Sequence, residues 1–211
     1  MPKIVLIHGF AAGLTAPFIR PPFGPSASFE AFKELVEKGE AVSFPWGIEQ
    51  QVNPLKLLNP LFLLGHYEKE RALAQARETH ERLKTFLEQI QPEKIICHSM
   101  GCFLLNNYLE NFSLPKSVKA IVFSQSDDTD FPFPSSSSSP SNPSSPFIHN
   151  LYCPWDPTLW VSCLYHKKQR AGLWPARQTS VKNVFVPLVR PINFHTNTIC
   201  DPWLVDYVSK L

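Results

Sequence analysis

Short apolar runs alternate with longer amphipathic stretches along most of this 211-residue chain. The runs are only a few residues long and rich in Val and Ile. Strands that are buried on both faces of a parallel sheet have this continuous apolar pattern, so the runs predict buried parallel strands. The six runs are Ile4–Ile7, Ala41–Phe44, Lys94–Cys97, Val118–Phe123, Phe147–Tyr152 and Asn183–Val189.

The stretches between these runs carry apolar residues at helical spacing, with polar residues on the opposite side. Gly39 ends the first stretch and Pro92 follows the second, as expected at helix C-termini. The predicted helices are Ser28–Lys38, Tyr67–Ile90, Met100–Phe112, Pro157–Lys168 and Pro202–Leu211. Alternating strands and helices predict one α/β domain over residues 1–211, with about six mostly parallel strands and helices on both faces.

Composition agrees with a folded domain, because 44% of the residues are hydrophobic and only 18% are charged. The net charge of +2, without any run of Lys or Arg, argues against a nucleic acid partner. The 21 prolines exceed the usual frequency and exclude a helical bundle. Most of them lie in predicted loops after strands. Pro187 falls within the last apolar run, so that strand should be an edge strand.

The stretch Pro132–Pro146 differs from the rest, because it contains five consecutive serines, Ser135–Ser139, and several prolines. It cannot bury enough apolar area to offset the entropy of ordering it, which predicts a mobile loop within the domain.

The N-terminal apolar run is too short for a signal peptide, and no window approaches the roughly 20 apolar residues of a membrane span. The five cysteines form no Cys-x-x-Cys pair, and no set of four residues has zinc-ligand spacing. We therefore expect reduced thiols, a cytoplasmic location, no structural metal and no cofactor.

A candidate nucleophile, Ser99, follows the third strand in Cys97-His98-Ser99-Met100-Gly101, directly before a predicted helix. A serine held on a sharp strand-to-helix turn exposes its hydroxyl, and small residues two positions away let strand and helix approach. The turn resembles the Gly-x-Ser-x-Gly nucleophile elbow of α/β-hydrolases, with Cys97 in place of the first glycine. The alternative is a serine that caps an ordinary strand-to-helix turn.

The first strand ends in His8-Gly9-Phe10. In α/β-hydrolases a His-Gly turn follows a strand beside the nucleophile strand. The resemblance implies an oxyanion hole formed by the backbone N–H groups of Phe10 and Met100. Taken alone, His8-Gly9 could be a glycine turn after any strand.

The same resemblance implies a triad in the chain order Ser, acid, His. Asp156 follows the fifth strand in an Asp-Pro turn, and His195 follows the sixth. Parallel strands would bring both to the sheet edge at which Ser99 lies. His195 would then be the base and Asp156 the acid. Asp127 and Asp128 (with Asp130), after the fourth strand, are alternative acids, and His195 could instead be a surface histidine.

The resemblance implies a minimal α/β-hydrolase without a separate cap, with strand order 2-1-3-4-5-6. The later segments around Trp155–Trp160, Arg170–Leu173 and Asn193–Thr196 are also similar to a group of bacterial esterase-like α/β-hydrolases. The apolar connector Pro45–Gly65 is either core packing or a small lid over an acyl pocket, and Phe10–Pro25 could form a second wall.

The function implied is a serine hydrolase that cleaves a small-molecule carboxylic ester or thioester. Two other functions stay open. One is a non-catalytic protein of the same fold that binds a ligand or partner. The other is amide or peptide hydrolysis, or acyl transfer, by the same triad.

Overall fold

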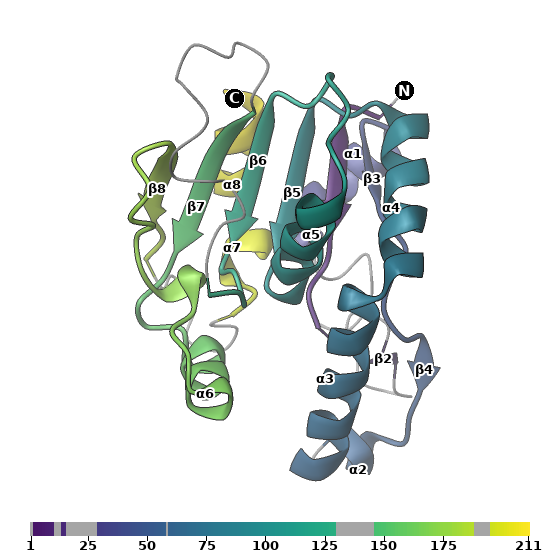
Figure 1. The fold of residues 1–211 in the computed structure, drawn as a ribbon, viewed down its shortest axis with the longest axis vertical. Helices are drawn as coiled ribbons and strands as arrows, with labels where there is room; N and C mark the ends of the chain where they lie inside the picture. Colours follow the sequence, from purple (N-terminus) through teal and green to yellow (C-terminus); the bar gives the residue numbers. More distant parts are fainter. Residues whose placement is uncertain (1, 11–13, 16–28, 58, 130–145, 188–194) are drawn as a thin grey trace.

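Six parallel strands form the central sheet of the computed structural model, which describes residues 2–10, 14–15, 29–57, 59–129, 146–187 and 195–211 (Figure 1). The strands are β1 (Ile4–Ile7), β3 (Ala41–Ser43), β5 (Lys94–His98), β6 (Ala120–Ser124), β7 (Phe147–Tyr152) and β8 (Val181–Phe185). Their order is β3-β1-β5-β6-β7-β8, and every neighbouring pair is parallel. The α/β class, the six strands and the order 2-1-3-4-5-6 are confirmed.

The last strand, β8, lies at the sheet edge as predicted. It ends at Phe185, however, so Pro187 lies beyond the strand and not within it. Because Pro187 lies outside β8, it removes none of the backbone N–H groups that pair this strand with β7. A second sheet was not predicted. It pairs β2 (Leu14–Thr15) with β4 (Gln50–Gln51), and two-residue strands are too short to give a pattern.

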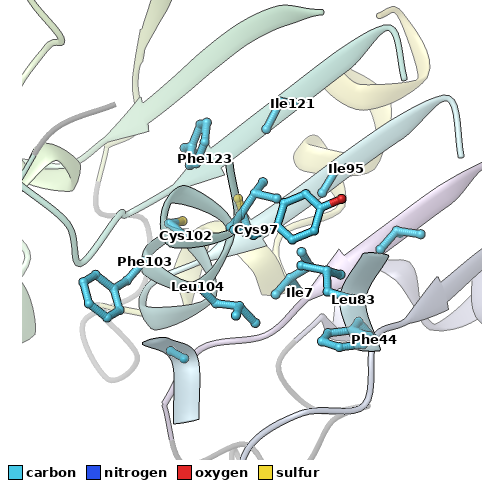
Figure 2. Packing of buried hydrophobic residues seen from close by; sticks show 14 of the residues in the cluster. Ile7, Phe44, Leu83, Ile95, Cys97, Cys102, Phe103, Leu104, Ile121 and Phe123 are labelled. Atoms are coloured by element: carbon cyan, nitrogen blue, oxygen red, sulfur yellow. The ribbon is translucent and has the colours of Figure 1, made fainter. Parts of the chain in front are cut away.

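Helices cover both faces of the sheet (Figure 1). On one face, α4 (Arg77–Ile90) and α5 (Met100–Asn111) pack against strand side chains such as Ile95 (Figure 2). On the other face, the next strand residue, Ile96, lies in a second core. That core includes residues of the 3₁₀ helix η1 (Glu30–Phe32) and of α8 (Pro202–Ser209). The remaining elements on the chain are α1 (Lys33–Glu37), α2 (Pro54–Leu57), α3 (Pro60–Gln75), α6 (Pro157–His166), η2 (Ala171–Leu173) and α7 (Asn197–Cys200).

The prediction of one long helix over Tyr67–Ile90 is wrong, because two helices, α3 and α4, occupy this stretch. Ala76 has an extended backbone (ψ 131°) and separates them. The His80 ring lies 2.8 Å from the Ala74 carbonyl oxygen, which satisfies an acceptor freed at the break. The first helix of the pair also begins earlier than expected, because the Asn59 side chain caps it and Pro60 occupies its first position.

The connector Pro45–Gly65 is only partly core. Trp46 and Val52 are buried, whereas Leu55 and Leu61 are 71% and 77% exposed. Helices α3 and α6 both extend past the carboxyl ends of the strands (Figure 1). The predicted mobile loop Pro132–Pro146 lies outside the described residues except for Pro146. Most of Phe10–Pro25 also lies outside them.

Candidate active site

Ser99 occupies a sharp turn between β5 and α5. Its backbone has φ 51° and ψ −120°, a region that a residue with a side chain rarely adopts. Three backbone hydrogen bonds hold this turn. The Ser99 N–H donates to the Ser124 carbonyl at 3.0 Å, and the Ser99 carbonyl accepts from Cys102 and Asp127. The strained conformation is therefore supported by the first turn of α5 and by the loop after β6.

Close packing around the turn requires small residues. A Cβ atom on Gly101 would lie 2.3 Å from the Ile7 carbonyl oxygen, and one on Gly9 would lie 2.8 Å from the Ser99 Cβ. Cys97, which replaces the first glycine of the motif, is fully buried, and its thiol donates to the Val122 carbonyl oxygen. The sheet therefore accommodates a small side chain at position 97 but leaves no room for one at 101.

Ser99, His195 and Asp156 form a continuous hydrogen-bonded chain. The Ser99 Oγ lies 2.6 Å from His195 Nε2, and His195 Nδ1 lies 2.6 Å from Asp156 Oδ2. A carboxylate oxygen only accepts, so Nδ1 carries the ring proton and Nε2 is left to accept from the serine hydroxyl. Three residues far apart in the sequence thus meet as expected, in the orientation that deprotonation of a serine requires.

Asp156 is held by more than His195. It is fully buried and caps α6, with Oδ1 accepting from the N–H groups of Thr158 and Leu159. Its Oδ2 also accepts from Gln125 Nε2 at 2.7 Å. Pro157 at the first helical position fixes the start of α6. The carboxylate is therefore fixed in position without any contribution from His195.

The charges of this pair shift both pKa values. Burial lowers the pKa of His195, but the Asp156 carboxylate, with weaker help from Asp127, outweighs burial and leaves it above its ordinary value. Burial raises the pKa of Asp156, but His195 and the Leu159 N–H outweigh it and leave this pKa below its ordinary value. The pair therefore favours an ionised acid and a base that is readily protonated.

His98, the residue before Ser99, contacts His195. Its Nε2 lies 2.8 Å from the His195 carbonyl oxygen, and the two rings are 4.7 Å apart. Burial, with the nearby His195 charge, lowers the pKa of His98 to about 3. A neutral ring whose Nε2 faces a carbonyl must donate its proton there. His98 therefore holds the backbone of His195 and is not itself a base.

The two predicted oxyanion donors belong to the two turns that meet at Ser99. Met100 follows it in the chain, and Phe10 follows Gly9, which packs against the serine. Trp46 secures this turn, since its Nε1–H donates to the His8 carbonyl and its ring stacks on the His8 ring. Among the described residues, neither the Phe10 nor the Met100 amide donates a hydrogen bond to another residue.

The alternative acids bond elsewhere. The Asp127 carboxylate accepts from Tyr67 and Ser162 and forms an ion pair with Arg170. The Asp128 carboxylate accepts from Asn106. Asp127 still contributes to the site through its backbone N–H, which donates to the Ser99 carbonyl at 3.2 Å. Asp130 lies outside the described residues. The histidine therefore meets Asp156 and neither of the two described alternatives.

Sequence reasoning missed the network of Tyr67, Asp127, Ser162, His166 and Arg170, and also missed Gln125. These residues come from α3, α6 and loops, and no short motif links them. The resemblance of Arg170–Leu173 to bacterial esterase-like α/β-hydrolases singled out Arg170, but nothing in the sequence indicates that this residue is buried or which residues it contacts.

Among the described residues, no cluster of His, Cys, Asp and Glu could hold a metal ion, and no helix is both long and apolar enough to cross a membrane. Comparisons with protein-family models, curated proteins and solved structures gave no match for this chain. A function for this chain is therefore inferred from the geometry of this site.

Proposed function

We propose that this chain is an α/β-hydrolase-like serine hydrolase that cleaves a carboxylic ester or thioester. The observation that carries the proposal is the chain of 2.6 Å contacts from Ser99 through His195 to buried Asp156. A serine hydroxyl is weakly nucleophilic at its ordinary pKa, so a base within hydrogen-bond reach that is oriented by a third group supplies the activation it needs.

The reaction would proceed in two halves. Ser99 Oγ attacks the substrate carbonyl carbon while its proton passes to His195 Nε2, and Asp156 stabilises the imidazolium. The Phe10 and Met100 N–H groups bind the oxyanion. The intermediate collapses as His195 returns the proton to the leaving alkoxide or thiolate, which leaves an acyl group on Ser99. Water, deprotonated by His195, then releases the carboxylic acid and restores the serine.

The partner proposed is a small-molecule acyl substrate, and no cofactor is needed for this chemistry. All five cysteines are unpaired in the structure, which supports a reducing, cytoplasmic setting as part of the same proposal.

Covalent labelling tests the proposal directly. A fluorophosphonate should add one adduct per molecule, and peptide mass spectrometry should locate it on Ser99 and not on Ser162, which also bonds a carboxylate. Heat-denatured protein should not react, because activation needs the folded site. Labelling of another serine, or none together with no turnover of p-nitrophenyl or thioester substrates, would contradict the proposal and favour a binding protein.

The pH dependence of kcat/KM should show one acid limb set by His195. The base must be neutral to accept the serine proton, so activity is lost as pH falls through its pKa. Asp156 raises that pKa, and the midpoint should therefore lie above the ordinary value for histidine. His98, with a pKa of about 3, should give no limb near neutrality. Rate profiles with a p-nitrophenyl ester measure this, and a midpoint below that of free histidine would contradict it.

A further inference from the structure

Helix α6 has its apolar side facing solvent. Its inward-facing residues are Leu159, Ser162, Cys163 and His166, of which only Leu159 is fully buried. The outward-facing residues are Trp160, Val161, Leu164 and Tyr165, with exposed fractions of 45%, 66%, 77% and 47%. At about 100° per residue these two sets lie on opposite sides of the helix. A helix on a water-facing surface ordinarily has the reverse arrangement.

Polar contacts fix α6 in this orientation. On its inner side, Ser162 donates to the Asp127 carboxylate, and His166 bonds the Tyr67 hydroxyl at 2.8 Å. Arg170, which follows the helix, is buried against Asp127. Rotating α6 to bury its apolar side would break this network and leave buried charges unpaired, which is costly. The apolar side is therefore held outward by the same residues that surround the candidate site.

The surroundings of this face are aromatic and basic. Trp155, directly before α6, is 67% exposed, and Trp174 packs edge-on against Trp160. Lys167 and Lys168 are exposed at the other end, and residues 157–168 contain no Asp or Glu. The neighbouring carboxylate of Glu68 raises the pKa of the Tyr165 hydroxyl. Exposed Trp, Tyr and Leu beside lysines form the combination that seats a helix in the headgroup region of an anionic bilayer.

We propose that the outer face of α6, with Trp155, Lys167 and Lys168, docks on an anionic phospholipid membrane surface. The apolar side chains would enter the headgroup boundary while both lysines contact lipid phosphates. A lipid surface suits this exposed face, with the indole rings of Trp155 and Trp160, because it does not need the shape-matched partner that a protein contact needs. Since Asp156 caps α6, docking would bring the carboxyl edge of the sheet to the bilayer. The docking does not depend on the proposed hydrolase chemistry.

Vesicle cosedimentation tests this inference. The full chain should sediment with vesicles of phosphatidylcholine containing about a third phosphatidylglycerol, and much less with pure phosphatidylcholine. Leu164→Glu should weaken partitioning at least about tenfold, and Lys167→Gln and Lys168→Gln about fivefold each. Phe147→Glu is the matched control, because Phe147 is 76% exposed at the amino end of β7, and it should bind as the wild type does.

Equal binding of Leu164→Glu and Phe147→Glu, or no sedimentation with anionic vesicles, would overturn the inference. Sedimentation velocity completes the test, since a dimer that Leu164→Glu dissociates would assign the face to a second copy instead. Ser99→Ala should bind vesicles as the wild type does, so failure of the hydrolase proposal and failure of docking are separable. Unchanged melting temperatures confirm that each variant is folded.

Discussion

Asp156→Asn is expected to lower kcat for an ester substrate by about 10³- to 10⁴-fold while the protein stays folded. The amide can donate to His195 Nδ1, which would move the ring proton to Nε2. A protonated Nε2 cannot accept from Ser99 Oγ, so the 2.6 Å contact between them no longer activates the serine. The imidazolium would also lose the charge that stabilises it. The acid limb of any residual activity should therefore move to lower pH, since Asp156 is what raises the pKa of His195.

Asp127→Asn and Asp128→Asn are the matched controls for this assignment. Both should retain kcat within about tenfold when rates are expressed per folded molecule, because neither described carboxylate bonds His195. Asp127→Asn should instead reduce stability, by about 3 kcal/mol, since buried Arg170 would lose its partner at 3.2 Å. Rates should be measured well below each unfolding transition. If kcat fell a thousandfold in Asp127→Asn or Asp128→Asn while Asp156→Asn stayed near wild type, the residue changed in that control would be the acid instead of Asp156.

The sheet could be predicted because its strands are buried on both faces, which leaves a continuous apolar pattern. Ile95, Ile96 and Cys97 show this, since they alternate between two cores yet are all fully buried. The close approach at Gly101 was likewise predictable, because the turn allows only a small residue there. Features that depend on local backbone conformation, or on burial of a whole strand, can thus be predicted from a few neighbouring residues.

Features that depend on contacts between distant elements were not predictable. Ala76 separates α3 from α4 although alanine is the best helix former, so tertiary packing decides the break and not propensity. Gln125 reaches Asp156 across 31 positions, and His98 reaches the His195 carbonyl across 97. No sequence pattern around Gln125 or His98 indicates which residue it contacts. The meeting of Ser99, Asp156 and His195 could be anticipated from the resemblance to α/β-hydrolases and from the shared edge at which parallel strands end. The contacts that support these residues required coordinates.

Gly101→Ala is the second change with a large expected effect. The added methyl would lie 2.3 Å from the Ile7 carbonyl oxygen and 2.5 Å from that of His8, both backbone atoms of β1 and its turn. Real contacts are never this short, so β1 and α5 would have to move apart. Overpacking of this kind costs about 3 kcal/mol, and we expect the melting temperature to fall by about 6–12 °C.

The same displacement should also impair the candidate chemistry. Phe10 lies two residues beyond His8, so a shift of that turn should move one candidate oxyanion donor, the Phe10 amide, relative to the other, the Met100 amide. Loss of one such donor costs about 10²- to 10³-fold in kcat, and the folded fraction of Gly101→Ala should lose activity on this scale.

Gly65→Ala is the control. Gly65 lies within α3 with nothing within 4 Å of an added Cβ, so alanine should stabilise the helix by up to about 1 kcal/mol and leave kcat unchanged. Thermal denaturation and ester hydrolysis rates of Gly101→Ala and Gly65→Ala test this prediction. Equal melting temperatures of the two variants would mean that β1 and α5 are packed less closely at Gly101 than the structure shows.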